Sequence, residues 1–250
     1  MMGMQDKVYI AGISCTKLGK RLDASVKQMV REAVDAALAD AGASVGDVDA
    51  AWFSNTRQPM LEGQNTVRGQ IALRPLGFES VPVVNIENAC ASGSSALIQA
   101  MAHLRAGMAD IALVVGAEKM VFPDRPEAMA AAFEGGTDIH DMEATKAFVR
   151  SLGGDADDES AGKRSIFMDL YAAQARAHMD RFGTTQEDFA AIAAKNHTHA
   201  QHNPLAQYRE PMSIEEVMAD KPIAFPFTRS MCAPLSDGAA AAVVCNAAGL

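Results

Sequence analysis

Apolar residues in the first half of the chain follow two alternating patterns. Short apolar runs of roughly six residues are typical of buried strands. Between them lie segments in which apolar residues recur every three or four positions, as on one face of a helix. The pattern predicts strands at 8–13, 48–53, 81–86 and 110–116 and helices at 25–41, 67–73 and 93–107. Strands that alternate with helices favour a parallel sheet with right-handed crossovers.

The pattern changes after residue 120. Residues 121–162 are rich in proline and glycine, which predicts a long loop. Further helices are predicted at 165–182, 185–195 and 211–219. The last apolar run, 236–245, predicts a strand that returns to the sheet begun at Val8. Its alanines are too small to fill space alone, so we expect a helix to pack closely on them, and 93–107 is the obvious candidate.

One segment combines these patterns with candidate chemistry, the corner between the strand at 81–86 and the helix at 93–107. Cys90 lies there, in the sequence Cys-Ala-Ser-Gly-Ser-Ser. A thiol at the start of a helix lies near the positive end of the helix dipole and near backbone N–H groups, which favours the thiolate. The same N–H groups can stabilise an oxyanion. The setting predicts a cysteine nucleophile for acyl transfer.

Cys90 also has a simpler interpretation. Free cysteines are among the most buried residues in proteins, and most of them are inert. The strand–turn–helix setting favours the catalytic interpretation, because it is the cysteine counterpart of the serine elbow of hydrolases. The small residues on both sides of Cys90 also let a substrate approach.

Composition excludes several classes of protein. The 250 residues carry a net charge of −9, which argues against nucleic acid as a partner, since no basic stripe is present. The four cysteines are scattered and form no CxxC pair, so neither a zinc site nor a disulfide framework is predicted. We find no secretory signal and no run of ~20 apolar residues. We therefore expect no membrane span, and a cytoplasmic protein or, in a eukaryote, one in an organelle matrix.

Two polar clusters are weaker candidates. His197, His199 and His202 lie close together, but no carboxylate or cysteine joins them at ligand spacing, so we favour a polar loop over a metal site. The second cluster is acidic, and its spacing matches no calcium loop, so a solvated turn is favoured. It consists of Asp155, Asp157, Asp158 and Glu159.

Several segments resemble the thiolase superfamily, in the order in which that family has them. Residues 85–94, with the sequence Asn-Ile-Glu-Asn-Ala-Cys-Ala-Ser-Gly-Ser, resemble its nucleophile segment, and 116–120 resemble the strand end that follows. Residues 195–204 and 232–241, the latter with Ser-Asp-Gly-Ala-Ala-Ala, are most similar to the sterol-carrier-protein type of thiolase. That type includes acetyl-CoA acetyltransferases and 3-ketoacyl-CoA thiolases. The resemblance spans nearly the whole chain.

The resemblance implies an α/β fold, a thiolase-like N-terminal βαβαβ half with an inserted, mostly helical loop domain. The core would comprise 1–120 and 223–250, and the loop domain 121–222. Cys90 would be the nucleophile that carries the acyl group as a thioester, with its own backbone N–H in one oxyanion hole. The reaction would cleave or form a 3-ketoacyl-CoA in lipid metabolism, as in β-oxidation.

The resemblance also implies the binding partners. Coenzyme A and acyl-CoA would be substrates, with no permanently bound cofactor and no metal. A homodimer or higher oligomer is typical of the family, and some relatives work with a small zinc-ribbon/OB-fold partner subunit. Three basic residues of the loop domain are either partners of the coenzyme A phosphates or solvated surface charges. They are Arg150, Lys163 and Arg164.

The chain departs from the family in one respect. Family members have a second βαβαβ half, which supplies the histidine that activates the nucleophile and a second cysteine that acts as acid and base. None of the six histidines matches those motifs, and the chain stops at Leu250, where that half would start. We therefore expect the N-terminal part of a thiolase, poorly active alone, because such groups act as a unit.

That expectation has a structural consequence and leaves two alternatives. A sheet face without the second half would be a large apolar patch, which we expect another chain or a continuation to cover. The first alternative is a non-catalytic thiolase-like subunit that binds acyl-CoA or a partner protein. The second is a ketoacyl-synthase-like condensing enzyme.

Overall fold

The computed structural model describes residues 7–154 and 165–250, which form two compact units. Unit 1 comprises Met1–Pro123 and Leu235–Leu250, and unit 2 comprises Asp124–Pro234. Each unit has buried apolar clusters of its own, so each is described by itself.

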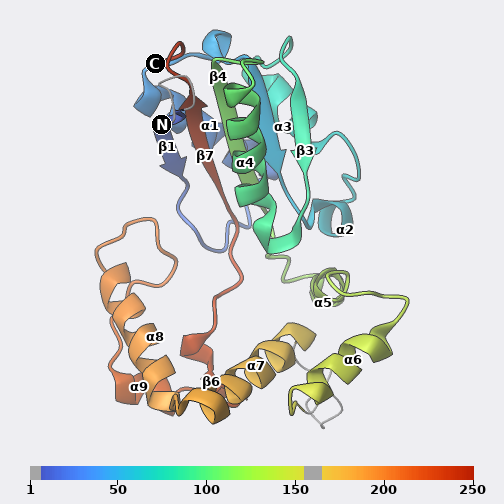
Figure 1. Ribbon diagram of the computed structural model, residues 1–250, viewed down its shortest axis with the longest axis vertical. Coiled ribbons are helices and arrows are strands. Elements are labelled where there is room, and N and C mark those ends of the chain that lie inside the picture. Colours follow the sequence, from blue (N-terminus) through green and yellow to red (C-terminus); the bar gives the residue numbers. More distant parts are fainter. Residues whose placement is uncertain (1–6, 155–164) are drawn as a thin grey trace. The chain divides into compact units, whose positions relative to one another are not determined.

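Unit 1 is built on a five-stranded mixed sheet (Figure 1). In spatial order its strands are β1 (Tyr9–Cys15), β7 (Gly238–Cys245), β4 (Ile111–Glu118), β2 (Ala50–Ser54) and β3 (Val83–Ile86). β2 runs parallel to both of its neighbours, whereas β7 is antiparallel to both β1 and β4. The last strand thus joins the sheet that begins at β1, as the sequence predicts. β1 and β2 do not pair with each other, because β7 and β4 lie between them.

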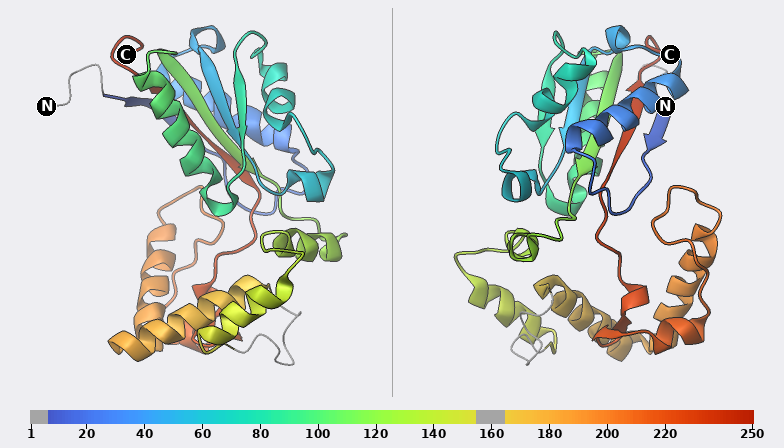
Figure 2. Two further views of the ribbon diagram at one scale, coloured as in Figure 1. Left: turned by 45° about the vertical axis from the view of Figure 1, so that its right-hand side comes forward. Right: turned by 180° about the vertical axis from the view of Figure 1, so that it is seen from behind.

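A helix covers each face of this sheet (Figure 2). α1 (Val26–Ala41) buries its apolar side on one face, and α4 (Ser92–Arg105) buries its apolar side on the other. Gly12 of β1 permits the close approach of α1, because a Cβ atom at this position would lie 2.5 Å from the Ala37 carbonyl oxygen. The arrangement is the α/β class that the alternating pattern predicts.

The packing of β7 corrects one expectation. Ala239 and Ala241 point to the face covered by α1, while Ala242 and Val244 point to the face covered by α4. Alternate residues of a strand face opposite sides of the sheet, so no single helix can cover the alanine-rich strand. The expectation that 93–107 is the helix that packs on these alanines was therefore wrong in part, because α1 covers Ala239 and Ala241.

The other segments of unit 1 differ from prediction in their limits and in one additional α-helix after β2. Between β2 and β3 the chain forms α2 (Gln58–Glu62) and α3 (Arg68–Leu73), the second close to the predicted 67–73. β4 extends two residues past the predicted end at 116, because β7 pairs with it as far as Glu118 and Gly238.

Unit 2 is mostly helical. Its elements are α5 (Pro126–Glu134), α6 (Met142–Ser151), α7 (Ile166–Phe182), α8 (Gln186–Ala200), α9 (Ile214–Ala219) and the short strands β5 (Pro222–Ala224) and β6 (Phe227–Thr228). The prediction of a long loop at 121–162 was wrong in part. Pro126 occupies the start of α5 and Gly135 follows its last residue, so these residues bound a helix and do not break it. α8 runs five residues past the predicted end at 195, because neither glycine nor proline interrupts it there.

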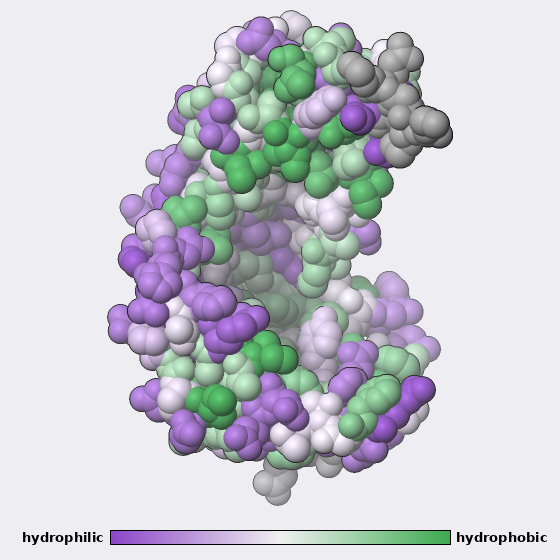
Figure 3. Space-filling model, turned by 60° about the vertical axis from the view of Figure 1, so that its left-hand side comes forward, coloured by the Kyte–Doolittle hydropathy of each residue, from purple (hydrophilic) through white to green (hydrophobic). Residues whose placement is uncertain are grey.

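An apolar surface remains along the edge strand β1. Ile10 and Ile13 are 64% and 62% exposed, and Ile98 on the outer side of α4 is 65% exposed. Figure 3 turns the β1 side of unit 1 toward the reader and shows apolar side chains gathered there. Among the described residues, no helix has the length and apolar content needed to cross a membrane.

Candidate active site

Cys90 lies at the sharp corner between β3 and α4. A single 3₁₀ turn, Ala89–Ala91, joins the strand to the helix, and Cys90 is its middle residue. The Cys90 thiol is free and exposed to solvent. A substrate therefore has open access to a sulfur atom at the N-terminal end of a helix, where the helix dipole favours negative charge.

The backbone of this turn is strained and leaves one donor unused. Ala89 has a φ of 45°, in the left-handed region that non-glycine residues avoid. Its N–H donates to Glu87 Oε1 at 2.7 Å. Within residues 7–154 and 165–250, the backbone N–H of Cys90 makes no hydrogen bond. That N–H is thus available to an oxyanion formed next to the thiol.

Ser92, the first residue of α4, holds the turn through two side-chain hydrogen bonds. Its side chain is buried, donates to the Ala89 carbonyl oxygen at 2.7 Å and accepts from the Asn88 N–H at 2.8 Å. The Ser92 hydroxyl therefore links the Asn88 N–H to the Ala89 carbonyl oxygen, on the N-terminal side of Cys90.

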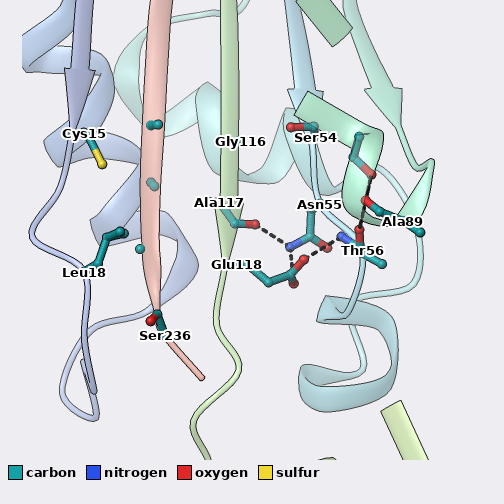
Figure 4. A pocket seen from close by; sticks show the side chains of 14 residues that line it. Cys15, Leu18, Ser54, Asn55, Thr56, Ala89, Gly116, Ala117, Glu118 and Ser236 are labelled. Atoms are coloured by element: carbon teal, nitrogen blue, oxygen red, sulfur yellow. Dashed lines mark hydrogen bonds between the residues drawn. The ribbon is translucent and has the colours of Figure 1, made fainter. Parts of the chain in front are cut away.

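A pocket of about 400 Å³ opens beside this turn (Figure 4). It lies within unit 1, between the carboxyl ends of β2 and β4 and the ends of β1 and β7 that adjoin them. Ala89 and Ser92 line it, whereas Cys90 does not. The full lining is Cys15, Leu18, Ser54, Asn55, Thr56, Ala89, Ser92, Gly116, Ala117, Glu118, Ser236, Gly238, Ala239 and Ala240.

Cys15, at the end of β1, is a second exposed cysteine in the same unit. Its sulfur lies 3.3 Å from the Thr16 carbonyl oxygen, and partial burial raises the pKa of its thiol. No helix begins beside Cys15, because the chain continues from β1 toward α1. It therefore provides an internal comparison for the reactivity of Cys90.

Sequence reasoning missed three polar residues that meet beside the Cys90 turn. Asn55 and Thr56 directly follow β2, and Glu118 ends β4 (Figure 4). The Glu118 carboxylate accepts hydrogen bonds from both of the other residues. Their position was the available signal, because polar residues at the carboxyl ends of adjacent parallel strands gather at one edge of the sheet.

The Ser-Asp-Gly segment that resembles the thiolase motif forms a buried clamp. Asp237 is fully buried, and its Oδ1 accepts from the N–H groups of Met120 (2.7 Å) and Val121 (2.9 Å). Its Oδ2 accepts from the Arg21 N–H (2.9 Å) and lies 3.7 Å from Lys119 Nζ. Asp237 therefore joins the places where the chain leaves unit 1 and re-enters it.

The remaining candidates belong to unit 2. His197 and His199 lie in α8, not in a loop, and His197 Nε2 lies 3.1 Å from the Ser230 carbonyl oxygen. In the described part of the chain, no three His, Cys, Asp or Glu residues are grouped so that they could hold a metal ion. Arg150 in α6 pairs with Glu143 at 3.4 Å.

Several residues that the sequence singled out lie outside the described ranges. They are Asp155, Asp157, Asp158, Glu159, Lys163 and Arg164.

Known proteins are similar to this chain in sequence, and solved structures are similar to it in fold. Residues 8–223 match the family described as "Thiolase, N-terminal domain". The acetyl-CoA acetyltransferase of Methanothermobacter thermautotrophicus is 34% identical over 241 residues, which cover 96% of this chain and 57% of that protein. Sterol carrier protein 2 of Gallus gallus is 30% identical over 245 residues, which cover 97% of this chain and 42% of that protein.

Among solved structures, the Ltp2-ChsH2(DUF35) aldolase is similar with a TM-score of 0.71 and 25% identity. The match covers 98% of this chain and 56% of that one. This chain thus spans about half the length of the proteins it matches. These similarities confirm the resemblance and the fold class that the sequence predicts. Because the family match covers most of its residues, the chain belongs to the thiolase family.

Proposed function

We propose that this chain supplies the nucleophile of a thiolase-type acyl-CoA acyltransferase, with Cys90 carrying the acyl group as a thioester. One observation carries the proposal. The exposed Cys90 thiol lies on a strained turn at a helix N-terminus, next to its own backbone N–H, which makes no hydrogen bond within the described part of the chain. Membership of the thiolase family supports the reaction class.

The proposed reaction has two steps. The Cys90 sulfur attacks the 3-keto carbon of a 3-ketoacyl-CoA, and the Cys90 N–H stabilises the oxyanion that forms. The bond between C2 and C3 then breaks, which leaves the acyl group on Cys90 and a shortened CoA thioester that takes up a proton. In the second step the thiol of coenzyme A attacks the acyl group, and the bond to Cys90 breaks.

The proposal needs a base that activates the thiol. His103 packs edge-on against Trp52 with ring centroids 5.1 Å apart, and the other five histidines belong to unit 2. We place the base in the second βαβαβ half that the family has. Thiolase chemistry would then be complete only when that half is present.

The same half, or a partner chain, is the proposed cover for the apolar surface of unit 1. Ile10 and Ile13 would be protected there, since patches of this kind mark interaction surfaces. A homodimer or higher oligomer fits this surface. A zinc-ribbon/OB-fold partner fits it as well, and one similar solved structure joins two named components, Ltp2 and ChsH2(DUF35).

A second candidate is cleavage of a carbon–carbon bond by an aldolase. The similarity to the Ltp2-ChsH2(DUF35) aldolase, at a TM-score of 0.71, favours it. The two candidates differ at Cys90, because an aldol cleavage passes through no acyl-cysteine.

Mass spectrometry tests the proposal directly. The protein is incubated with acetyl-CoA at mildly alkaline pH, and peptides are searched for an acetyl group on each cysteine. We expect the adduct on Cys90, its loss in Cys90→Ser and its retention in Cys15→Ser. Alkylation by iodoacetamide near neutral pH should also be several times faster at Cys90 than at Cys15.

Two results would contradict the proposal. An acyl group on Cys15, Cys232 and Cys245 at the same rate as on Cys90 would mean that the turn confers no special reactivity. No adduct at all, together with equal alkylation of Cys15 and Cys90, would favour the non-catalytic subunit.

A further inference from the structure

The Glu118 carboxylate holds the loop that follows β2. Oε1 accepts from Asn55 Nδ2 (3.0 Å) and from the Arg57 N–H (3.0 Å), and Oε2 accepts from the Thr56 N–H (2.9 Å). Figure 4 shows the carboxylate facing the loop. One side chain at the end of β4 thus satisfies three donors of a neighbouring strand end, so the loop has little freedom to move.

The Thr56 side chain connects this loop to the Cys90 turn. Its Oγ1 lies 3.3 Å from the Ala89 carbonyl oxygen and 3.2 Å from Ser92 Oγ. Ser92 gives its only hydroxyl proton to the Ala89 carbonyl oxygen, at 2.7 Å. The Thr56 hydroxyl is thus within hydrogen-bond distance of two groups of the turn and can donate to the Ala89 carbonyl oxygen, so it links the turn to the loop.

The surroundings of Glu118 require a carboxylate, because a neutral amide could not accept all of its hydrogen bonds. Burial raises the pKa of Glu118, while the N–H groups of Thr56 and Arg57 and the charges of Arg57 and Arg68 act in the opposite direction. Arg68 also donates to both oxygens of Asn55 at 2.9 Å. A glutamine would present one acceptor oxygen and one NH₂ group to the same three donors, so at least one donor would face another donor.

The turn needs such a support. Ala89 is held at a φ of 45°, a conformation that persists in non-glycine residues only where the surroundings impose it. The thiol and the unpaired N–H of Cys90 lie directly after Ala89, so a change at Ala89 redirects both.

We infer that Glu118 is a positioning residue for the nucleophile, which acts through Thr56 to fix the Ala89–Ser92 turn and the direction of Cys90. The inference rests on the proposed role of Cys90 as nucleophile. Among the described residues, Glu118 makes no hydrogen bond to Cys90. Its effect is geometric, and misplacement of a reacting group by about 1 Å can cost on the order of a hundredfold in rate.

The test compares four variants in the acylation and alkylation of Cys90, with Cys15 as the internal reference. Glu118→Gln and Thr56→Val should each lower the Cys90 rate by about tenfold, a part of what full misplacement costs. Thr56→Ser keeps the hydroxyl, so Cys90 in this variant should react at the wild-type rate. The Glu118→Gln/Thr56→Val double variant should be no slower than the slower single variant, because both remove one chain of contacts.

Glu79→Gln is the matched control. Glu79 lies in the same unit on the surface, with its side chain 67% exposed and 3.9 Å from Arg74. The same loss of charge there should leave the Cys90 rate unchanged.

Hydrogen exchange of the amides at 88–92 provides a second readout that needs no reactive thiol. Faster exchange at 88–92 in Glu118→Gln and in Thr56→Val, by a larger factor than in the amides of β4 and β7, is the expected result. Unchanged exchange and unchanged Cys90 rates in both variants would overturn the inference, as would effects that multiply in the double variant. A wild-type Cys90 no faster than Cys15 would contradict the proposed function alone, since the exchange data would still decide the role of Glu118.

Discussion

Two segments of unit 1 carry thiolase-like sequence motifs, and they are built in opposite ways. Asp237 is 0% exposed, and three backbone N–H groups and the Lys119 ammonium surround its carboxylate. Cys90 is exposed, follows a left-handed alanine, and its own N–H makes no hydrogen bond to the described residues. Both motifs look equally distinctive in the sequence.

The difference teaches how to separate stability from chemistry. A buried polar group with every partner in place lowers the free energy of the fold and has nothing left to offer a substrate. A strained turn with an open donor lowers stability and persists where function requires it. The contrast favours a structural role for the Ser-Asp-Gly motif in unit 1 and supports the proposed reactive role of the Cys90 turn.

The largest expected effect comes from breaking the buried clamp. Asp237→Ala should lower the free energy of unfolding by about 3–5 kcal/mol, because it leaves the Lys119 ammonium buried without its counter-charge and removes the acceptor for three N–H groups. Chemical denaturation followed by circular dichroism measures it. Asp23→Ala, in an exposed position of the same loop as Arg21, should change the stability by less than about 0.5 kcal/mol. Equal effects of the two substitutions would refute the clamp.

The same contrast explains how much the sequence could predict. The strands and helices of unit 1 follow local periodicity, so their order and the strand–turn–helix at Cys90 could be predicted. The place of β7 between β1 and β4 could not, because strand pairing depends on contacts between distant segments. The support of the Cys90 turn stayed hidden for the same reason, since Thr56 lies 33 residues from Ala89 and 62 from Glu118.

Unit 2 was harder to predict than unit 1. Its helices α5 and α6 are short, and their prolines and glycines lie at helix ends. Composition alone cannot distinguish a helix bounded by such residues from a loop that contains them. The buried clusters of this unit are small and dominated by alanine, which gives a weak periodic signal.

An intermediate effect is expected inside the Cys90 turn itself. Ser92→Ala should lower the free energy of unfolding by about 1–3 kcal/mol, because the part-buried hydrogen bonds from the Asn88 N–H and to the Ala89 carbonyl oxygen are both lost. Thermal unfolding measures this loss. Ser94→Ala is the control, since the exposed Ser94 hydroxyl only donates to the Ala91 carbonyl oxygen at 3.0 Å. A loss at Ser94 as large as at Ser92 would show that Ser92 has no special part in holding the turn.

The smallest expected effect tests whether the turn is strained. The informative result is the sign of the change in the free energy of unfolding. Ala89→Gly should raise the free energy of unfolding by up to about 1 kcal/mol, because glycine adopts a φ of 45° without the Cβ clash that costs an alanine ~1–2 kcal/mol. The greater freedom of glycine in the unfolded chain offsets part of that gain. Ala91→Gly, at a φ of −94°, has no clash to relieve and should lower stability by about 0.5–1 kcal/mol. Opposite signs for two Ala→Gly changes within one turn would locate the strain at the residue before Cys90. Because glycine keeps the φ of 45°, alkylation of Cys90 in Ala89→Gly should stay close to the wild-type rate, whereas destabilisation by Ala89→Gly would contradict the strain at residue 89.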